Sequence, residues 1–161
     1  TIDPQDFSYP HGTHLAAMEV DTETGKVTLR KYVCVDDVGV QVNPMIVEGQ
    51  VHGGVAQGIA QALYEGASYD EDGQPQNANL STYLIPSAPD LPSFITDTTC
   101  TPSTTNPLGT KGVGEAGAIA STPAIMNGIV DAIRHLGVND VLMPATPMTV
   151  WKTIQAAKGG K

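Results

Sequence analysis

The stretch THLAAMEVDTETGKVTLRKYVCV, residues 13–35, lies near the N-terminal end of the chain and gives the strongest indication of its fold class. Its first part, residues 13–20, is typical of a strand, and residues 27–35 are rich in the β-branched residues that strands favour. Between them the segment TETGK places Gly25 where a turn requires a positive φ angle. The stretch therefore predicts a β-hairpin.

A helical pattern follows this hairpin. Asn43 and Pro44 suit the cap and the first residue of a helix, and the pattern continues over residues 45–63. Each interior glycine costs a helix roughly 0.5–1 kcal/mol relative to alanine. Either close packing of another helix or the close approach of a ligand must compensate, and the sequence leaves both explanations open. The glycines concerned are Gly49, Gly53, Gly54 and Gly58.

The remainder of the chain predicts a mixed architecture. It contains a turn at 70–74 that closes a short hairpin, an extended segment at 80–92, a strand at 93–99, a loop at 101–114, a helix at 116–136 and a helix from 146 onward. The sequence Ser121-Thr122-Pro123 predicts a break near the start of the first of these helices. We therefore expect an α+β fold with mixed α/β layers, a single domain over residues 1–161, and a flexible tail at 158–161.

Composition limits the kinds of partner. Of the 161 residues, 17 are acidic and 8 basic, which gives a formal charge of −9 and argues against nucleic acid and anionic membrane surfaces. No apolar run approaches the roughly 18 residues of a membrane helix, and TIDPQDFSYP is not a signal peptide. We expect an excised or processed piece of a cytoplasmic protein. Because only 16% of residues are charged, we also expect much of the surface to be covered.

The cysteines and histidines do not predict a metal site. Cys34 and Cys100 are far apart and form no CxxC motif, so we expect two ordinary buried or half-buried thiols. His11 and His14 have a spacing of three, but they precede the predicted strand, and we expect no metal there.

The most informative motif is the glycine-rich segment GTKGVGEAG, residues 109–117. Its glycines have GxGxxG spacing, yet no buried strand precedes them and Glu115 would repel a pyrophosphate, so a dinucleotide site is not expected. Exposed N–H groups and the cation of Lys111 favour an anionic ligand, and the Glu115 carboxylate is a candidate general base. The alternatives are a surface ion pair on a flexible loop, or a carboxylate that complements a helix dipole.

Several motifs in the same order resemble one family. These are EVDTETGKV at 19–27, DDVGVQVNP at 36–44, GQVHGGVAQGIAQALYE at 49–65, STYLIPSAPDLP at 81–92 and KGVGEAG at 111–117. Together they resemble the molybdenum hydroxylases of the xanthine dehydrogenase/aldehyde oxidase family, in particular the C-terminal segment of the molybdopterin-binding large subunit.

The resemblance implies roles for individual residues. Glu115 would be the catalytic base, which takes a proton from a molybdenum-bound hydroxyl. The preceding residues would lie against the cofactor, and Gln50 would contact the molybdopterin, which would also account for glycines in its helix. His52 stands where some members carry glutamate, and it would either line the pocket or face solvent. The residues against the cofactor would be Lys111, Gly112, Val113 and Gly114.

The resemblance also implies a cofactor and partners. The cofactor would be molybdopterin, alone or as its cytosine dinucleotide, and the isolated chain would not hold it stably. The partners would be the remainder of the large subunit, iron–sulfur and flavin subunits or domains, and a small-molecule substrate such as an aldehyde or an N-heterocycle, oxidised with water as the oxygen source. The alternative is a non-catalytic truncated domain or assembly module without cofactor.

Overall fold

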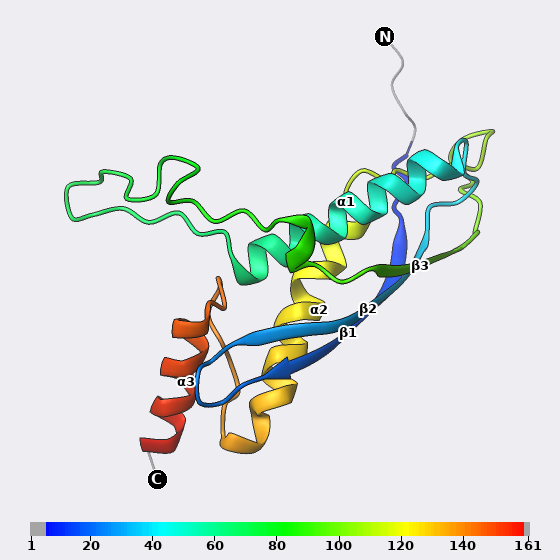
Figure 1. The fold of residues 1–161 in the computed structure, drawn as a ribbon. Coiled ribbons are helices and arrows are strands. Elements are labelled where there is room, and N and C mark those ends of the chain that lie inside the picture. Colours follow the sequence, from blue (N-terminus) through cyan, green and yellow to red (C-terminus); the bar gives the residue numbers. More distant parts are fainter. Residues whose placement is uncertain (1–5, 160–161) are drawn as a thin grey trace.

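The computed structural model describes residues 6–159 (Figure 1). Its elements, in chain order, are β1 (His11–Val20), β2 (Val27–Asp37), α1 (Pro44–Leu63), the 3₁₀ turn η1 (Ala88–Asp90), β3 (Phe94–Thr99), α2 (Ala116–Ile133), the 3₁₀ turn η2 (Arg134–Leu136) and α3 (Pro147–Gly159). This is the α+β fold with mixed layers that the sequence predicts. Residues 158 and 159, predicted as part of a flexible tail, belong to α3, while residues 160–161 and the start of TIDPQDFSYP lie outside the described residues.

The three strands form one mixed sheet in the order β1-β2-β3. β1 and β2 pair antiparallel and confirm the predicted hairpin, whereas β2 and β3 pair parallel. The strand β1 begins at His11, so both histidines lie within the strand and do not precede it. Because parallel strands need a crossover, α1 and the segment after it connect β2 to β3. The C-terminal ends of these two strands therefore meet at one edge, where Asp37 is paired with Thr99.

The turn between β1 and β2 also positions α3. Gly25 has a φ of +73°, as predicted for this turn. A Cβ atom at Gly25 would collide with the carbonyl oxygen of Pro147 and lie 2.7 Å from the amide nitrogen of Trp151. Two separate constraints therefore require glycine at this position: the positive φ angle of the turn and the close approach of α3.

Close helix packing accounts for two of the four glycines in α1. A Cβ atom at Gly58 would lie 2.5 Å from the Cβ of Ser121, and one at Gly54 would lie 2.9 Å from the amide nitrogen of Ala118. Both glycines therefore let the backbone of α2 approach α1 closely. Gly49 and Gly53 differ, because a Cβ atom there would meet no described atom within 4 Å.

The helix α2 is continuous, so the break predicted at Ser121–Pro123 is wrong. Pro123 lies inside the helix, where it removes one backbone donor without ending the helix. The buried residues Ile125, Ile129 and Ile133 recur every four positions and pack against the core. Packing of this face outweighs the local cost of the proline.

The stretch Ala116–Leu136 needs a second correction. It has a mean hydropathy of 1.2 and is long and apolar enough, by length and composition alone, to cross a membrane. This corrects the expectation that no apolar run approaches the length of a membrane helix. Its apolar face is used inside the domain, where Ile125, Ile129 and Ile133 are fully buried. A core helix passes the same test, so the stretch is weak evidence for a membrane span.

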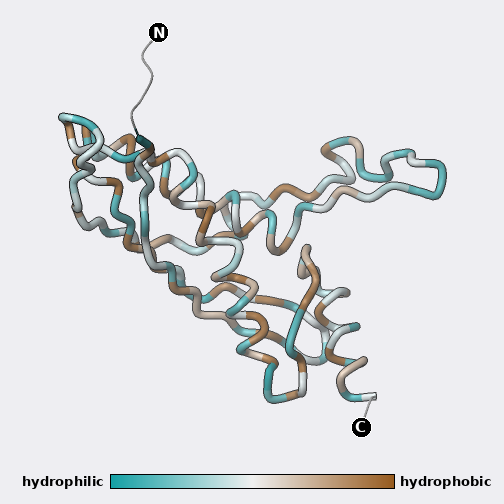
Figure 2. The backbone as a smooth tube through the Cα atoms, turned by 180° about the vertical axis from the view of Figure 1, so that it is seen from behind, coloured by the Kyte–Doolittle hydropathy of each residue, from teal (hydrophilic) through white to brown (hydrophobic). Residues whose placement is uncertain are grey.

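The segment between α1 and η1 forms an arm that extends away from the helices and the sheet (Figure 1). The isolated bridge between Tyr69 and Pro75 flanks the predicted turn at 70–74. Figure 2 shows that the far end of this arm is hydrophilic. Several large apolar side chains of this segment are exposed, including Leu80, which is 81% accessible.

Candidate cofactor-binding site

The glycine-rich loop docks against the C-terminal edge of the parallel strand pair. After β3 the chain folds back so that the N–H of Val40 donates to the carbonyl of Gly109 at 3.0 Å, and the N–H of Lys111 donates to the carbonyl of Val38 at 2.9 Å. Gly39 has a φ of +65°, and a Cβ atom there would run into the Gly109 carbonyl. The backbone between residues 109 and 111 is therefore fixed to the end of β2.

A buried ion pair completes this docking. The ammonium group of Lys111 lies 2.9 Å from Oδ1 of Asp37, and the two side chains are 10% and 1% accessible. The N–H of Gly39 donates to the same oxygen, and the hydroxyl of Thr99 donates to the other one. Burial alone would raise the pKa of Asp37, but the hydrogen bonds from Lys111 and Gly39 outweigh it and hold this pKa well below its usual range.

This arrangement bears on the alternative interpretations of Lys111. The sequence left open a surface ion pair on a flexible loop, but the ion pair is buried and its partner is Asp37. Lys111 thus anchors the loop, and a contact between Lys111 and a cofactor stays a prediction. Asp37 itself was missed, although the sequence DDVG directly after a predicted strand was visible as a signal.

Two of the predicted site segments lie in contact. Nε2 of Gln50, on the exposed side of α1, donates to the carbonyl oxygen of Gly114 at 2.9 Å. The next residue, Glu115, is the N-cap of α2, and its exposed side chain makes no cap hydrogen bond to that helix. The structure therefore brings Gln50 and the loop together and leaves the carboxylate of Glu115 facing outward.

The loop itself has an inner and an outer side. Val113 is half-buried and packs against Val38, Val47 and Ala116. On the outer side, Gly112 and Gly114 are exposed, and a Cβ atom on either would meet nothing described within 4 Å. No hydrogen bond among residues 6–159 uses the N–H of these two glycines. Free N–H groups beside open space fit the phosphate and oxo groups of an anionic cofactor.

His52 and the cysteines are also placed by the structure. His52 faces β3, with Nε2 3.3 Å from the hydroxyl of Thr96 and its ring edge-on to Phe94. It is thus half-buried against β3. Cys34 and Cys100 are both free thiols, but Cys100 is exposed, which corrects the expectation of two buried or half-buried thiols.

Comparison with known proteins decides the family. Residues 1–92 match the family model of the molybdopterin cofactor-binding domain. The chain belongs to this family. It is 39% identical, over 95% of its length, to the carbon monoxide dehydrogenase large chain of Hydrogenophaga pseudoflava. It also resembles members of the xanthine dehydrogenase family, such as a xanthine dehydrogenase molybdenum-binding subunit of Escherichia coli, with 33% identity over 91% of the chain and 19% of that subunit.

Solved structures agree with this assignment. The crystal structure of quinoline 2-oxidoreductase from Pseudomonas putida 86 superposes on 95% of the chain with a TM-score of 0.91 and 39% identity. The chain spans about one-fifth of the length of these proteins, 19% of the Hydrogenophaga large chain and 20% of the crystallised oxidoreductase chain. Its relatives are molybdenum hydroxylases, and the chain matches one segment of them.

Proposed function

We propose that this chain is the C-terminal part of the molybdopterin-binding large subunit of a molybdenum hydroxylase, in which Glu115 is the catalytic base. The observation that carries the proposal is the hydrogen bond from Gln50 to Gly114, because it joins two separate motifs directly beside Glu115. The identity to large subunits of such enzymes supports the proposal. The substrate would be an aldehyde, an N-heterocycle or a related C–H compound, with water as the oxygen source.

Different residues of the chain would have different roles at the cofactor. The molybdenum cofactor, when bound, supplies the two-electron redox chemistry of the reaction. The free N–H groups of Gly112 and Gly114 would bind its anionic groups, and the amide of Gln50 would orient it. The exposed carboxylate of Glu115 would accept and release one proton at each turnover. The ion pair between Lys111 and Asp37 would hold the loop in register while this happens.

The exposed apolar surface supports a further partner, the remainder of the large subunit. Val42, Met45 and Leu80 are 78%, 76% and 81% accessible. Large apolar side chains exposed in this number fit a surface that another part of the enzyme covers. Met45 lies on α1, and the same helix carries Gly49 and Gly53, where a Cβ atom would meet no described atom within 4 Å. Iron–sulfur and flavin subunits or domains would then accept the electrons, and the cofactor would stay bound only in this assembly.

Substitution of Glu115 in the assembled enzyme tests the proposal. We expect Glu115→Gln to lower turnover by roughly 10²–10⁴-fold, the usual contribution of a positioned acid–base group, with the molybdenum content unchanged. The matched control is Glu23→Gln, because Glu23 lies in the exposed turn between β1 and β2. Turnover would be measured with a panel of aldehydes and N-heterocycles and a dye as electron acceptor. Parent-like turnover of Glu115→Gln would refute the base assignment, and a purified wild-type assembly without molybdenum would favour the non-catalytic alternative.

A further inference from the structure

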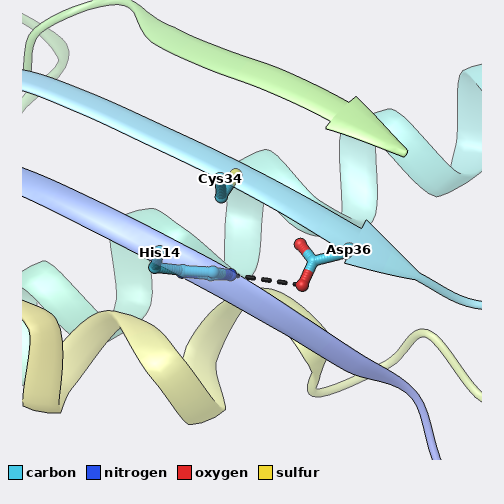
Figure 3. Close-up of side chains that lie close together, drawn as sticks. All are labelled: His14, Cys34 and Asp36. Atoms are coloured by element: carbon cyan, nitrogen blue, oxygen red, sulfur yellow. Dashed lines mark hydrogen bonds and ion pairs between the residues drawn. The ribbon is translucent and has the colours of Figure 1, made fainter. Parts of the chain in front are cut away.

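A second cluster of chemically active side chains lies inside the domain, on the sheet face that packs against the helices. His14 of β1 is paired in register with Cys34 of β2, and Asp36 follows two residues later on the same face (Figure 3). One donor atom from each residue lies within 4.8 Å of the other two. Cys34 is 1% accessible, and the side chains of His14 and Asp36 are 1% and 3% accessible.

Asp36 is the residue of the cluster whose carboxylate lacks a hydrogen-bond partner on one oxygen. Oδ1 lies 3.2 Å from Nε2 of His14, but Oδ2 is buried and has no hydrogen-bond partner among the described residues. A buried polar group left without a partner costs about 1–3 kcal/mol, and more when it is charged. The neighbouring cation cannot relieve this, because Lys111 pairs with Asp37. The cluster thus contains a buried carboxylate oxygen that a cation could bind.

His14 is oriented by a second partner. Its Nδ1 lies 2.6 Å from the hydroxyl oxygen of Tyr32, whose ring is fully buried and edge-on to the imidazole. This contact fixes the ring and directs the other nitrogen toward Asp36. A histidine that binds a metal through one nitrogen is commonly held at the other in this way.

With the thiol of Cys34 as a thiolate, the three side chains carry two negative charges, which match the charge of a divalent cation. Cys34 is a free thiol and only 1% accessible, so its sulfur is available as a third donor beside His14 and Asp36, as a thiolate once a metal ion displaces its proton. A divalent cation bound by one thiolate, one carboxylate and one neutral imidazole would form a group without net charge. Such a group is far less costly to bury than the lone carboxylate.

We propose that His14, Cys34 and Asp36 bind one divalent first-row metal ion through three protein ligands, with zinc the best fit, at a site separate from the glycine-rich loop. Nitrogen, sulfur and carboxylate oxygen are the donors that zinc prefers, at about 2.0–2.3 Å. Two ligands of one ion would thus be about 3.3–3.7 Å apart, a modest closure from the present spacing. Binding exchanges the Cys34 proton for the metal, and the proton leaves to solvent with no change of oxidation state. Since the site is buried, the ion would enter during folding.

Metal analysis of the assembled protein from its native host tests the proposal. We expect zinc at parity with the chain in the wild type, and roughly tenfold less or lower in Cys34→Ala, with molybdenum and iron unchanged. The matched control is Cys100→Ala, since Cys100 is exposed and lies outside the cluster. Zinc retained fully in Cys34→Ala would overturn the site, because its sulfur donor would then be dispensable.

A spectroscopic measurement on the wild type keeps the proposal falsifiable if Cys34→Ala fails to fold. Protein produced with cobalt in place of zinc should show an intense near-ultraviolet band from thiolate-to-cobalt charge transfer. Asp36→Asn, which is nearly isosteric, should weaken cobalt retention but preserve the fold. Wild-type protein with neither stoichiometric zinc nor a cobalt–thiolate band would overturn the proposal, and the cluster would then be a metal-free hydrogen-bond network. Neither result depends on the role of Glu115.

Discussion

The ammonium group of Lys111 lies 2.9 Å from a carboxylate oxygen of Asp37, although 74 positions separate the two residues in the chain. The pair joins the end of β2 to the loop that leads into α2. Because both side chains are nearly inaccessible, water cannot replace either partner if the other is removed. The geometry of the proposed catalytic loop therefore depends on a residue that lies outside it.

Removal of Asp37 alone should be worse than removal of the whole pair. In Asp37→Asn the buried ammonium of Lys111 loses its counter-charge, and we expect turnover of the assembled enzyme to fall roughly 10–100-fold through displacement of the loop. The double variant Asp37→Asn/Lys111→Met should recover part of this loss, because no buried charge is then unpaired. A double-mutant cycle on turnover and cofactor content measures the coupling. Additive effects of the two substitutions would contradict the coupling.

The same pair predicts an acid dependence of stability. The pKa of Asp37 is lowered from 3.8 in the folded protein, so its stabilising contribution is present above that ordinary value and is lost as the pH falls below it. As the pH is lowered below about 4, the free energy of unfolding should therefore fall more steeply in the wild type than in Asp37→Asn. Denaturant titrations at several pH values check this. Parallel curves for the two proteins would show that Asp37 does not titrate as described.

Gln50 should matter for cofactor retention more than for folding. Gln50→Ala removes the hydrogen bond to Gly114 and the amide that would face the molybdopterin. We expect lower molybdenum and pterin content per assembled enzyme, with an unchanged circular dichroism spectrum. Gln57→Ala is the control, since Gln57 is exposed on the same helix. Equal cofactor content in both variants would count against the contact role of Gln50.

The glycines of α1 should respond differently to substitution. A Cβ atom at Gly58 would lie 2.5 Å from Ser121, so Gly58→Ala should cost roughly 1–3 kcal/mol through overpacking of the helix interface. Gly53→Ala meets no described atom and should not lower the midpoint of thermal unfolding, because alanine favours the helix. Calorimetry of both variants gives the comparison. A similar loss of stability in both would mean that α1 and α2 do not pack as described.

Local patterns predicted most elements but not their long-range partners. The hairpin and the capped start of α1 follow from turn and cap residues within a few positions of one another, and both are confirmed. The parallel pairing of β2 with β3 depends on a crossover of more than fifty residues, which no local pattern encodes. The break predicted at Pro123 was wrong for the same reason, since burial of the isoleucine face of α2 decides that helix.

In the candidate site too, residues with a local sequence signal were predicted, and their long-range buried partners were not. Lys111 and Glu115 are predicted site residues from their spacing and from the family resemblance, and Gln50 from the resemblance alone; their roles stay predictions. The buried partner Asp37 and the cluster around Asp36 were missed, because adjacent acidic residues after a strand look like a solvated turn. Only the three-dimensional placement of β1, β3 and the returning loop shows that both carboxylates are buried.

The distance in sequence between Asp37 and Lys111 also sets an order of events during synthesis. Asp37 leaves the ribosome 74 residues before Lys111, which at about 5–20 residues per second is a delay on the order of 4–15 s. Until then the carboxylate can remain hydrated, so the hairpin can form early while its far end stays open. Arrival of Lys111 then allows that end to close, so the rate of synthesis sets when the glycine-rich loop can take its shape.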